Sequence, residues 1–260
     1  MARAFWKGTI SFGMVSIPVR MSLATESRAP GFHLLHKKCL TRPKQVLYCA
    51  QDDVYFSQKE TVRGYEYERD QFVVFKDTDF DKVPVKTTHS IEIHAFVRGE
   101  EVDPVYFHGS HYIEPEKLGV KPFFMLRRAL EETKLVGIAK VAFQRREHLC
   151  CLRPYAGILA LHTMHYRDEI LPPPEAPADE KVNVREMELA LTLVKTMAGE
   201  FKPQDFRDDY ATALERMVKA KIDGKPIKAV PPAPAVETVD LMAMLRASIE
   251  SARKVPVRER

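Results

Sequence analysis

Residues 122–166, PFFMLRRALEETKLVGIAKVAFQRREHLCCLRPYAGILALHTMHY, combine one helical pattern with three strand patterns. The first part of this stretch predicts a helix that opens at Pro122, where the missing N–H costs nothing, and ends at Gly137. The apolar stripe of this helix consists of Phe123, Leu126 and Leu130. Three strands are expected next, at 138–144, 148–153 and 157–166, and their short connections favour antiparallel pairing.

Upstream residues extend the same sheet. Residues 15–23 alternate between apolar and polar side chains, which predicts a strand with one buried face. Pro18 removes a ladder donor, so we expect this strand at an edge or at a bulge. Further strands are predicted at 72–75 and 91–97, and short ones at 103–107 and 111–115 with a turn at Gly109 between them. The fold class is therefore mainly β with α, an antiparallel β-barrel core spanning residues 1–171.

A long insertion, HLLHKKCLTRPKQVLYCAQDDVYFSQKETVRGYEYE, interrupts the strands at residues 33–68. We call it the arm. It is too polar and irregular for a core, and an insertion of this size in a compact barrel is uncommon unless it has a function. As two extended limbs of about fifteen residues, each would reach ~50 Å. That exceeds the ~12 Å width of a DNA major groove, so our hypothesis is an arm held across a duplex.

Charge is segregated along the chain. The net charge is only +4, but residues 1–48 hold eight bases against one acid, and residues 49–110 hold seven bases against thirteen acids. The basic segment predicts attraction to a polyanion. The candidate DNA-binding residues are Lys37, Lys38, Arg42 and Lys44 on the first limb of the arm, and Arg63 on the second. The alternatives are a solvated hairpin and charges that interleave once the chain is folded.

Helices follow the barrel. LPPPEAPADEK at 171–181 predicts a stiff linker, and residues 182–224 predict a helical hairpin whose first helix carries a capping box at Asn183 and Glu186. That helix is apolar on two sides, so it must be buried twice. It forms either a dimer contact or an intrachain core. The candidate dimer-contact residues are Met187, Leu191, Leu193 and Val194.

Residues 225–260 predict a Pro-rich tether and a short C-terminal helix that starts at about Val239. The apolar face of this helix consists of Leu241, Met242, Leu245 and Ile249. A helix this short cannot hold itself together in water beyond a flexible tether. It is either disordered alone or docks on a partner through that face.

Several classes of function are disfavoured. There is no P-loop, Rossmann glycine motif or Gly-x-Ser-x-Gly elbow, so no enzyme and no cofactor are predicted. Asp77, Asp79 and Asp81 alternate as in a solvated turn or helix start and do not predict a metal pair. His162 and His165 are expected on opposite faces of a strand.

The cysteines also argue against a metal and against secretion. His33, His36, Cys39 and Cys49 are of zinc-compatible type, but their spacing is weak and no metal site is predicted. With Cys150 and Cys151 they form no disulfide framework. No signal peptide or membrane-spanning run is visible, so an intracellular, reduced protein is expected.

The chain resembles the prokaryotic Ku proteins. The stretches that carry the resemblance are FWKGTISFGMVSIPVRMSLAT, FHLLHKK, RGYEYE, DPVYF, LRRALEETKLVGIAKVAFQRREHLCCLRP, LALHTMHYRDEI and VDLMAMLRASIE. They run in order along nearly the whole chain. One departure is the arm sequence YCAQDD, in which Cys49 lacks the second cysteine of the Cys-x-x-Cys found in many bacterial relatives.

The resemblance implies a non-enzymatic homodimer that closes a ring around double-stranded DNA ends, with the arm as the bridge over the duplex. It also implies recruitment of an ATP-dependent DNA ligase by the C-terminal helix, for double-strand break repair by non-homologous end joining. Such a protein is expected to be cytoplasmic and nucleoid-associated. The alternative is a basic β-barrel scaffold that binds nucleic acid without end specificity.

Overall fold

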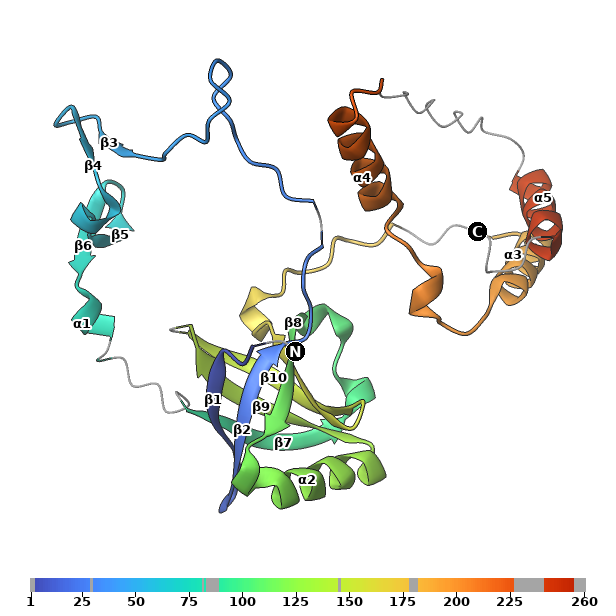
Figure 1. Ribbon diagram of the computed structural model, residues 1–260. Helices are drawn as coiled ribbons and strands as arrows, with labels where there is room; N and C mark the ends of the chain where they lie inside the picture. Colours follow the sequence, from blue (N-terminus) through green and yellow to red (C-terminus); the bar gives the residue numbers. More distant parts are fainter. Residues whose placement is uncertain are drawn as a thin grey trace. The chain divides into compact units, whose positions relative to one another are not determined.

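The computed structural model describes residues 3–28, 30–80, 82, 89–144, 146–177, 182–226 and 241–254 (Figure 1). The chain divides into two compact units, residues 1–27 with 33–173 and residues 28–32 with 174–260. The first unit contains a β-barrel and the arm, and the second contains helices that follow the barrel.

Seven strands form a closed barrel in the order β1-β2-β8-β11-β10-β9-β7. Their bounds are β1 Trp6–Phe12, β2 Val15–Leu23, β7 Ser90–Arg98, β8 Phe107–Pro115, β9 Leu135–Phe143, β10 Arg146–Tyr155 and β11 Ile158–Met164. The predicted barrel is confirmed, but it is mixed, because β1 and β7 pair in parallel with Thr9 opposite Ser90. The chain re-enters β7 from the end of the barrel where β1 begins, so the two strands run in the same direction.

The period-2 pattern of β2 points one row of side chains into the barrel, where Ile17, Val19 and Met21 are wholly buried. Helix α2 (Val120–Thr133) packs against β9, β10 and β11 and adds the predicted stripe of Phe123, Leu126 and Leu130 to the same core. It lies below the barrel in the view of Figure 1. This single core holds the scaffold from which the arm projects.

Several predicted boundaries were wrong. Helix α2 ends before Gly137, because Lys134 adopts a left-handed φ of 57° and Gly137 lies in β9. Of the predicted strand at 103–107 only Phe107 is a strand residue, the first of β8. Pro104–Tyr106 is a 3-10 turn, and the side chain of Asp103 accepts a hydrogen bond from Val105 N at 2.9 Å. Gly109 makes no turn but lies within β8, where its N–H donates to Thr163 Oγ1 at 3.0 Å.

Pro18 is not on an edge strand, because β2 lies between β1 and β8. The β8 ladder reaches only Val19, opposite Pro115, so Pro18 lies just beyond its last pair. Its carbonyl accepts a hydrogen bond from Glu116 N at 2.9 Å. The missing N–H of proline therefore costs no ladder bond at this position.

The connection between β2 and β7, residues 24–89, contains two small hairpins: the first lies within the arm, and the second begins in the arm and ends just beyond it. Its elements are β3 Leu47–Cys49, β4 Val54–Phe56, the 3-10 turn Gln58–Glu60, β5 Arg63–Glu68, β6 Gln71–Phe75 and α1 Asp77–Phe80. β3 pairs with β4 and β5 with β6, each as a separate two-stranded sheet. The barrel has further 3-10 turns at Gly99–Glu101, Lys117–Gly119 and Arg167–Glu169.

The second unit contains α3 (Val184–Met197), a 3-10 turn (Pro203–Asp205), α4 (Asp209–Ile222) and α5 (Leu241–Lys254). The main helix pair is α3 with α5, which lie side by side in Figure 1. The sequence pattern predicted a hairpin of α3 with α4 instead. That prediction assumed that neighbouring helices fold back on each other, but an extended segment with its own turn at Pro203 separates them.

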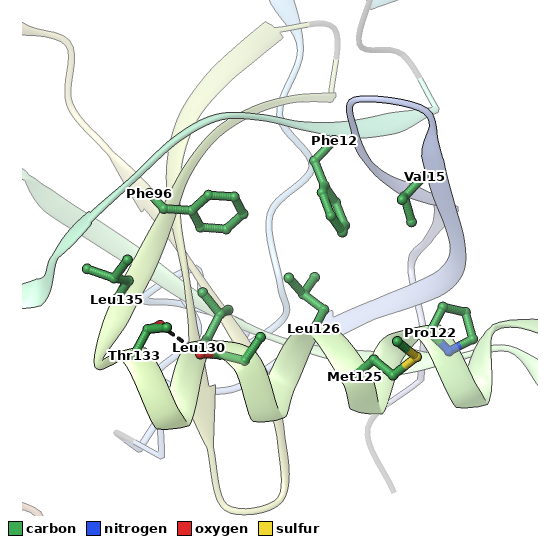
Figure 2. Close-up of a pocket in the computed structure, with 10 residues that line it drawn as sticks. Phe12, Val15, Phe96, Pro122, Met125, Leu126, Leu130, Thr133 and Leu135 are labelled. Atoms are coloured by element: carbon green, nitrogen blue, oxygen red, sulfur yellow. Dashed lines mark hydrogen bonds between the residues drawn. The ribbon is translucent and has the colours of Figure 1, made fainter.

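An apolar pocket of about 450 Å³ lies between α2 and the strands β1, β2, β7 and β9. In Figure 2, Leu126 and Leu130 of the helix point toward Phe12 and Phe96, and Met125 lies beside Pro122. The rings of Phe12 and Phe96 are arranged edge-to-face, with their centres 6.2 Å apart. The hydroxyl of Thr133, at one end, donates to Ala129 O at 2.7 Å. The pocket therefore presents almost no free polar group with which to perform chemistry.

We predict that Phe123→Ala lowers the free energy of unfolding by about 3–5 kcal/mol, because it leaves a cavity in a wholly buried site. The matched control is Phe124→Ala. Phe124 is 40% exposed, and its loss is expected to cost about 1 kcal/mol or less. Urea denaturation followed by circular dichroism measures both, and equal costs would show that α2 does not close the core.

Candidate nucleic-acid interface

The arm contributes nothing to the buried core. Between residues 33 and 75 every residue is exposed except Cys49 and Phe56, which are half-buried, and none is buried. Its hairpins are only three to six residues long per strand. Isolated hairpins of this kind are marginal in water, so the described contacts of the arm give it little stability of its own.

The first limb of the arm presents its cations on a tight turn. Thr41 O accepts from His36 N at 2.9 Å, His36 O accepts from Leu40 N at 2.8 Å, and Leu40 adopts a φ of 52°. This turn brings Lys37 and Lys38 together at its tip. Arg42 and Lys44 follow on the extended chain, and all four cations are exposed.

These four cations are not neutralised by the protein. Among the residues that the structure describes, no carboxylate lies within ion-pair distance of Lys37, Lys38, Arg42 or Lys44. Exposed cations without a carboxylate partner are suited to contact phosphates. Such contacts position a duplex but do not read its base sequence.

Arg63 is placed differently from the other four. Its guanidinium lies 3.8 Å from a carboxylate oxygen of Asp77 and 5.1 Å from the centre of the Phe80 ring. These contacts attach α1 to the β5–β6 hairpin. The structure therefore gives Arg63 a local structural partner and does not bring it together with the cations of the first limb.

The β5–β6 hairpin carries exposed aromatic side chains that the sequence reasoning missed. Tyr65 is 66% exposed, Tyr67 is 55% exposed and Phe72 is 59% exposed. The alternation of tyrosines in RGYEYE could have indicated this surface. The sequence reasoning did not pair that strand with residues 71–75, so the aromatic side chains were not seen as one surface. Exposed apolar patches of this kind mark interaction sites.

The candidate zinc ligands do not converge. Cys39 Sγ contacts His36 Nδ1 at 3.1 Å and Thr41 Oγ1 at 2.9 Å, whereas Cys49 Sγ donates to Asp52 at 3.3 Å within its own hairpin. Within the described part of the chain, no group of three or more His, Cys, Asp or Glu side chains is arranged to hold a metal ion.

The alternating aspartates mark a helix start. Asp79 accepts from Lys76 N at 3.0 Å and pairs with Lys82 at 3.1 Å, and the first contact holds the pKa of Asp79 below its usual value. Asp81 lies outside the described residues. Of the helices described, none is both long enough and apolar enough to span a bilayer.

The two sides of α3 differ in exposure. Met187, Leu191 and Val194 are 46%, 50% and 66% exposed, whereas Leu193 is half-buried. On α5, Met242 and Leu245 are half-buried and Ile249 is only 7% exposed. Leu241 begins the helix. The apolar face of α5 therefore meets α3, and the described residues leave one side of α3 uncovered.

A polar site on the outer face of the barrel was also missed. It is lined by Ser110, Tyr112, Arg153, Tyr155 and His162. These residues come from three strands, so only the register of the sheet brings them together.

Comparison with known proteins defines the class. The sequence model of the family described as the Ku70/Ku80 beta-barrel domain matches residues 11–191, which include the end of β1, the other six barrel strands, the arm and the first half of α3. The match therefore covers the elements that form the candidate interface.

Full-length relatives specify the branch. The chain is 41% identical over 254 residues to the non-homologous end joining protein Ku of Symbiobacterium thermophilum, covering 96% of this chain and 63% of that relative. It is 38% identical over 264 residues to the Ku protein of Solibacter usitatus, covering 100% and 99%. It is 38% identical over 254 residues to that of Archaeoglobus fulgidus, covering 96% and 100%. The chain belongs to the prokaryotic Ku family, whose members are non-enzymatic DNA-end-binding proteins of double-strand break repair.

We predict that Cys39 is the most reactive cysteine. The hydrogen bond from the Thr41 side chain, helped by His36, lowers the pKa of the Cys39 thiol to about 7, whereas burial raises the pKa of Cys151 to about 11 and that of Cys150 further. Alkylation by iodoacetamide should rise with pH to half its maximum near pH 7, because only the thiolate reacts. Thr41→Val should move that midpoint upward. Peptide mass spectrometry gives the rate at each cysteine, and an unchanged midpoint would contradict the assigned cause.

Proposed function

We propose that this chain binds double-stranded DNA ends without sequence preference, as a ring-shaped homodimer, and recruits an ATP-dependent DNA ligase for non-homologous end joining. The observation that carries this proposal is the arm, with four exposed, unpaired cations and no buried residue. The chain performs no catalysis in this scheme, and it acts in the cytoplasm at the nucleoid.

The charge of the arm supports phosphate contact in preference to base readout. The cations lie on a turn and an extended limb, whereas base readout generally uses a helix or a β-ribbon fitted into the major groove. Four cations in each of two protomers contact up to about eight phosphates, which corresponds to a log–log salt slope near −7. Binding is then strong at low salt and indifferent to sequence.

The topology of the β2–β7 connection supports a preference for ends. The arm is anchored to the barrel on both sides, by β2 before it and β7 after it. A segment anchored twice makes a closed loop with its scaffold. A duplex enclosed by such a loop enters by threading, and threading needs an end.

The test compares linear duplex with a covalently closed circle of the same sequence. We expect loading on linear DNA only, and trapping when the ends are sealed by ligation, so that a salt rinse no longer removes the protein. Neutralising Lys37→Gln with Lys38→Gln should weaken loading and reduce the salt slope by about 3.6, since four contacts of a dimer are lost.

The matched control is Lys121→Gln with Arg128→Gln on α2, which removes the same charge from two other exposed residues. It should leave affinity and slope nearly unchanged. Equal affinity for circles and linear fragments, with no trapping, would favour the scaffold without end specificity. An arm variant that behaves like the α2 control would remove the arm from the interface.

The proposed dimer contact rests on the uncovered side of α3. A two-sided apolar helix has one side against α5, and the other, with Met187, Leu191 and Val194, is free to pack against a second copy. Leu193 lies on the half-buried side. Its contribution to the dimer is therefore expected to be indirect, through the α3–α5 pair.

We predict that Leu191→Asp raises the dimer dissociation constant by about 30-fold or more, because it places a charge in an apolar interface. Thr192→Asp is the matched control: the same charge on the neighbouring, exposed residue. Analytical ultracentrifugation across micromolar concentrations measures both. Identical association for the two variants would move the interface away from this side of α3.

Ligase recruitment is assigned to α5. Its apolar face meets α3, so a ligase that binds this face replaces α3 as the partner of the helix. The predicted tether that precedes α5 lies largely outside the described residues, at 227–240.

We predict that Met242→Ala with Leu245→Ala abolishes stimulation of the cognate ligase and leaves DNA-end binding within about twofold, since the two tasks use different surfaces. The control is Met244→Ala, because Met244 is exposed and lies off the apolar face. Ligation of a linear plasmid, with and without the protein, provides the readout. Full stimulation by the double variant would assign recruitment to the barrel or the arm.

A further inference from the structure

A small pocket on the outer face of the barrel follows from the register of three neighbouring strands. Ala160 of β11 lies opposite Tyr112 of β8 on one side and opposite Arg153 of β10 on the other. Alternate residues of a strand point to the same face, so these three side chains form a row. The methyl group of Ala160 is short, and the gap that it leaves between its neighbours is a pocket of about 240 Å³.

A hydrogen-bond relay orients the polar groups of this pocket. Arg153 Nε donates to His162 Nε2 at 2.8 Å. Because a guanidinium has no acceptor, Nε2 must be the acceptor, and the proton of the neutral ring lies on Nδ1. That proton is donated to Ser110 Oγ, 2.9 Å away. The hydroxyl proton of Ser110 is therefore left for an acceptor in the pocket.

The ring at the centre of the relay stays neutral. Burial, followed by the charge of Arg153 and by His111, lowers the pKa of His162 to about 4. At physiological pH the ring therefore keeps accepting from Arg153 while donating to Ser110. His162 acts as a positioning residue, because it sets the direction of two donors without needing to touch a ligand itself.

The charge of Arg153 is not neutralised by the protein. Within the described residues, no carboxylate lies within ion-pair distance of its guanidinium. The group lies 5.6 Å from the centre of the Tyr155 ring, which is itself stacked on Tyr112 at 5.9 Å and 18°. One of its five N–H donors is used on His162, and the four on its two terminal nitrogens remain available for a bidentate contact.

We propose that this pocket binds a phosphate group of the DNA backbone. The Arg153 guanidinium would hold two phosphate oxygens and the Ser110 hydroxyl would donate to one of them. Thr25, which also lines the pocket, lies just beyond β2, and Ala24 N donates to Ser110 O at 3.2 Å. The phosphate would therefore be held where the chain leaves the barrel toward the arm. This inference rests on the proposed function and adds a barrel contact to it.

The test measures the affinity for a linear duplex of about two helical turns against salt concentration. Arg153→Gln is expected to weaken binding roughly tenfold, since a charged bidentate contact is lost. It should also reduce the salt slope by about 0.9 for each phosphate contact removed. Ser110→Ala should weaken binding by about threefold with an unchanged slope, because a neutral donor releases no counterion.

Arg128→Gln is the matched control. It makes the same change at an exposed arginine of α2, which does not line the pocket. Thermal unfolding of each variant confirms the fold. Arg153→Lys gives a second measure that keeps the charge but loses the planar fork, and an intermediate affinity is expected.

The outcomes distinguish failure of the proposed function from failure of the phosphate pocket. A wild-type protein that fails to bind linear duplex would overturn the proposed function. The phosphate pocket alone would be overturned if the wild-type protein binds linear duplex, Arg153→Gln binds like the Arg128→Gln control, and Ser110→Ala binds like wild type. The ring and the arm would then stand without it.

Discussion

The parallel pairing of β1 with β7 is the contact on which the barrel depends. It places Ile10 opposite Ile91, and both side chains are wholly buried. Without it the sheet would keep two open edges, each with unpaired backbone groups. The pairing also anchors the return of a long excursion, because β7 follows directly from the β2–β7 connection. The β1–β7 pairing therefore both closes the barrel and anchors the end of the β2–β7 connection.

Local patterns were sufficient for most of the barrel. The alternation in 15–23 correctly predicted that Ile17, Val19 and Met21 face inward, since a period of two depends only on neighbouring residues. Val15 and Leu23, at the two ends of β2, are exposed instead. Residues 103–107 show the limit of such patterns. The Val-Tyr-Phe run suggests a strand, but the side chain of Asp103 caps a 3-10 turn at Pro104–Tyr106, and the turn forms instead. The parallel closure and the α3–α5 pair were beyond reach, because each joins segments far apart in the chain.

The same division applies to the interface. Composition predicted an exposed insertion with four basic residues, because the segment has few apolar side chains for a core. The structure shows these four residues exposed, and their contact with DNA stays a prediction. Arg63 was grouped with them on charge, but its contacts with Asp77 and Phe80 depend on how β5, β6 and α1 fold together. The relay from Arg153 through His162 to Ser110 needs the register of β8, β11 and β10. Sequence patterns within one strand could not predict this relay, because its three residues come from three strands.

The β2–β7 connection begins and ends at one end of the barrel and adds no buried residue between positions 33 and 75. Its effect on the stability of the barrel is then mainly the entropy of closing a loop, and doubling such a loop costs only ~0.6 kcal/mol. Natural selection can lengthen, shorten or recompose this segment almost without penalty to the scaffold. The barrel and the β2–β7 connection can therefore change independently in evolution, because only the barrel is constrained by the buried core.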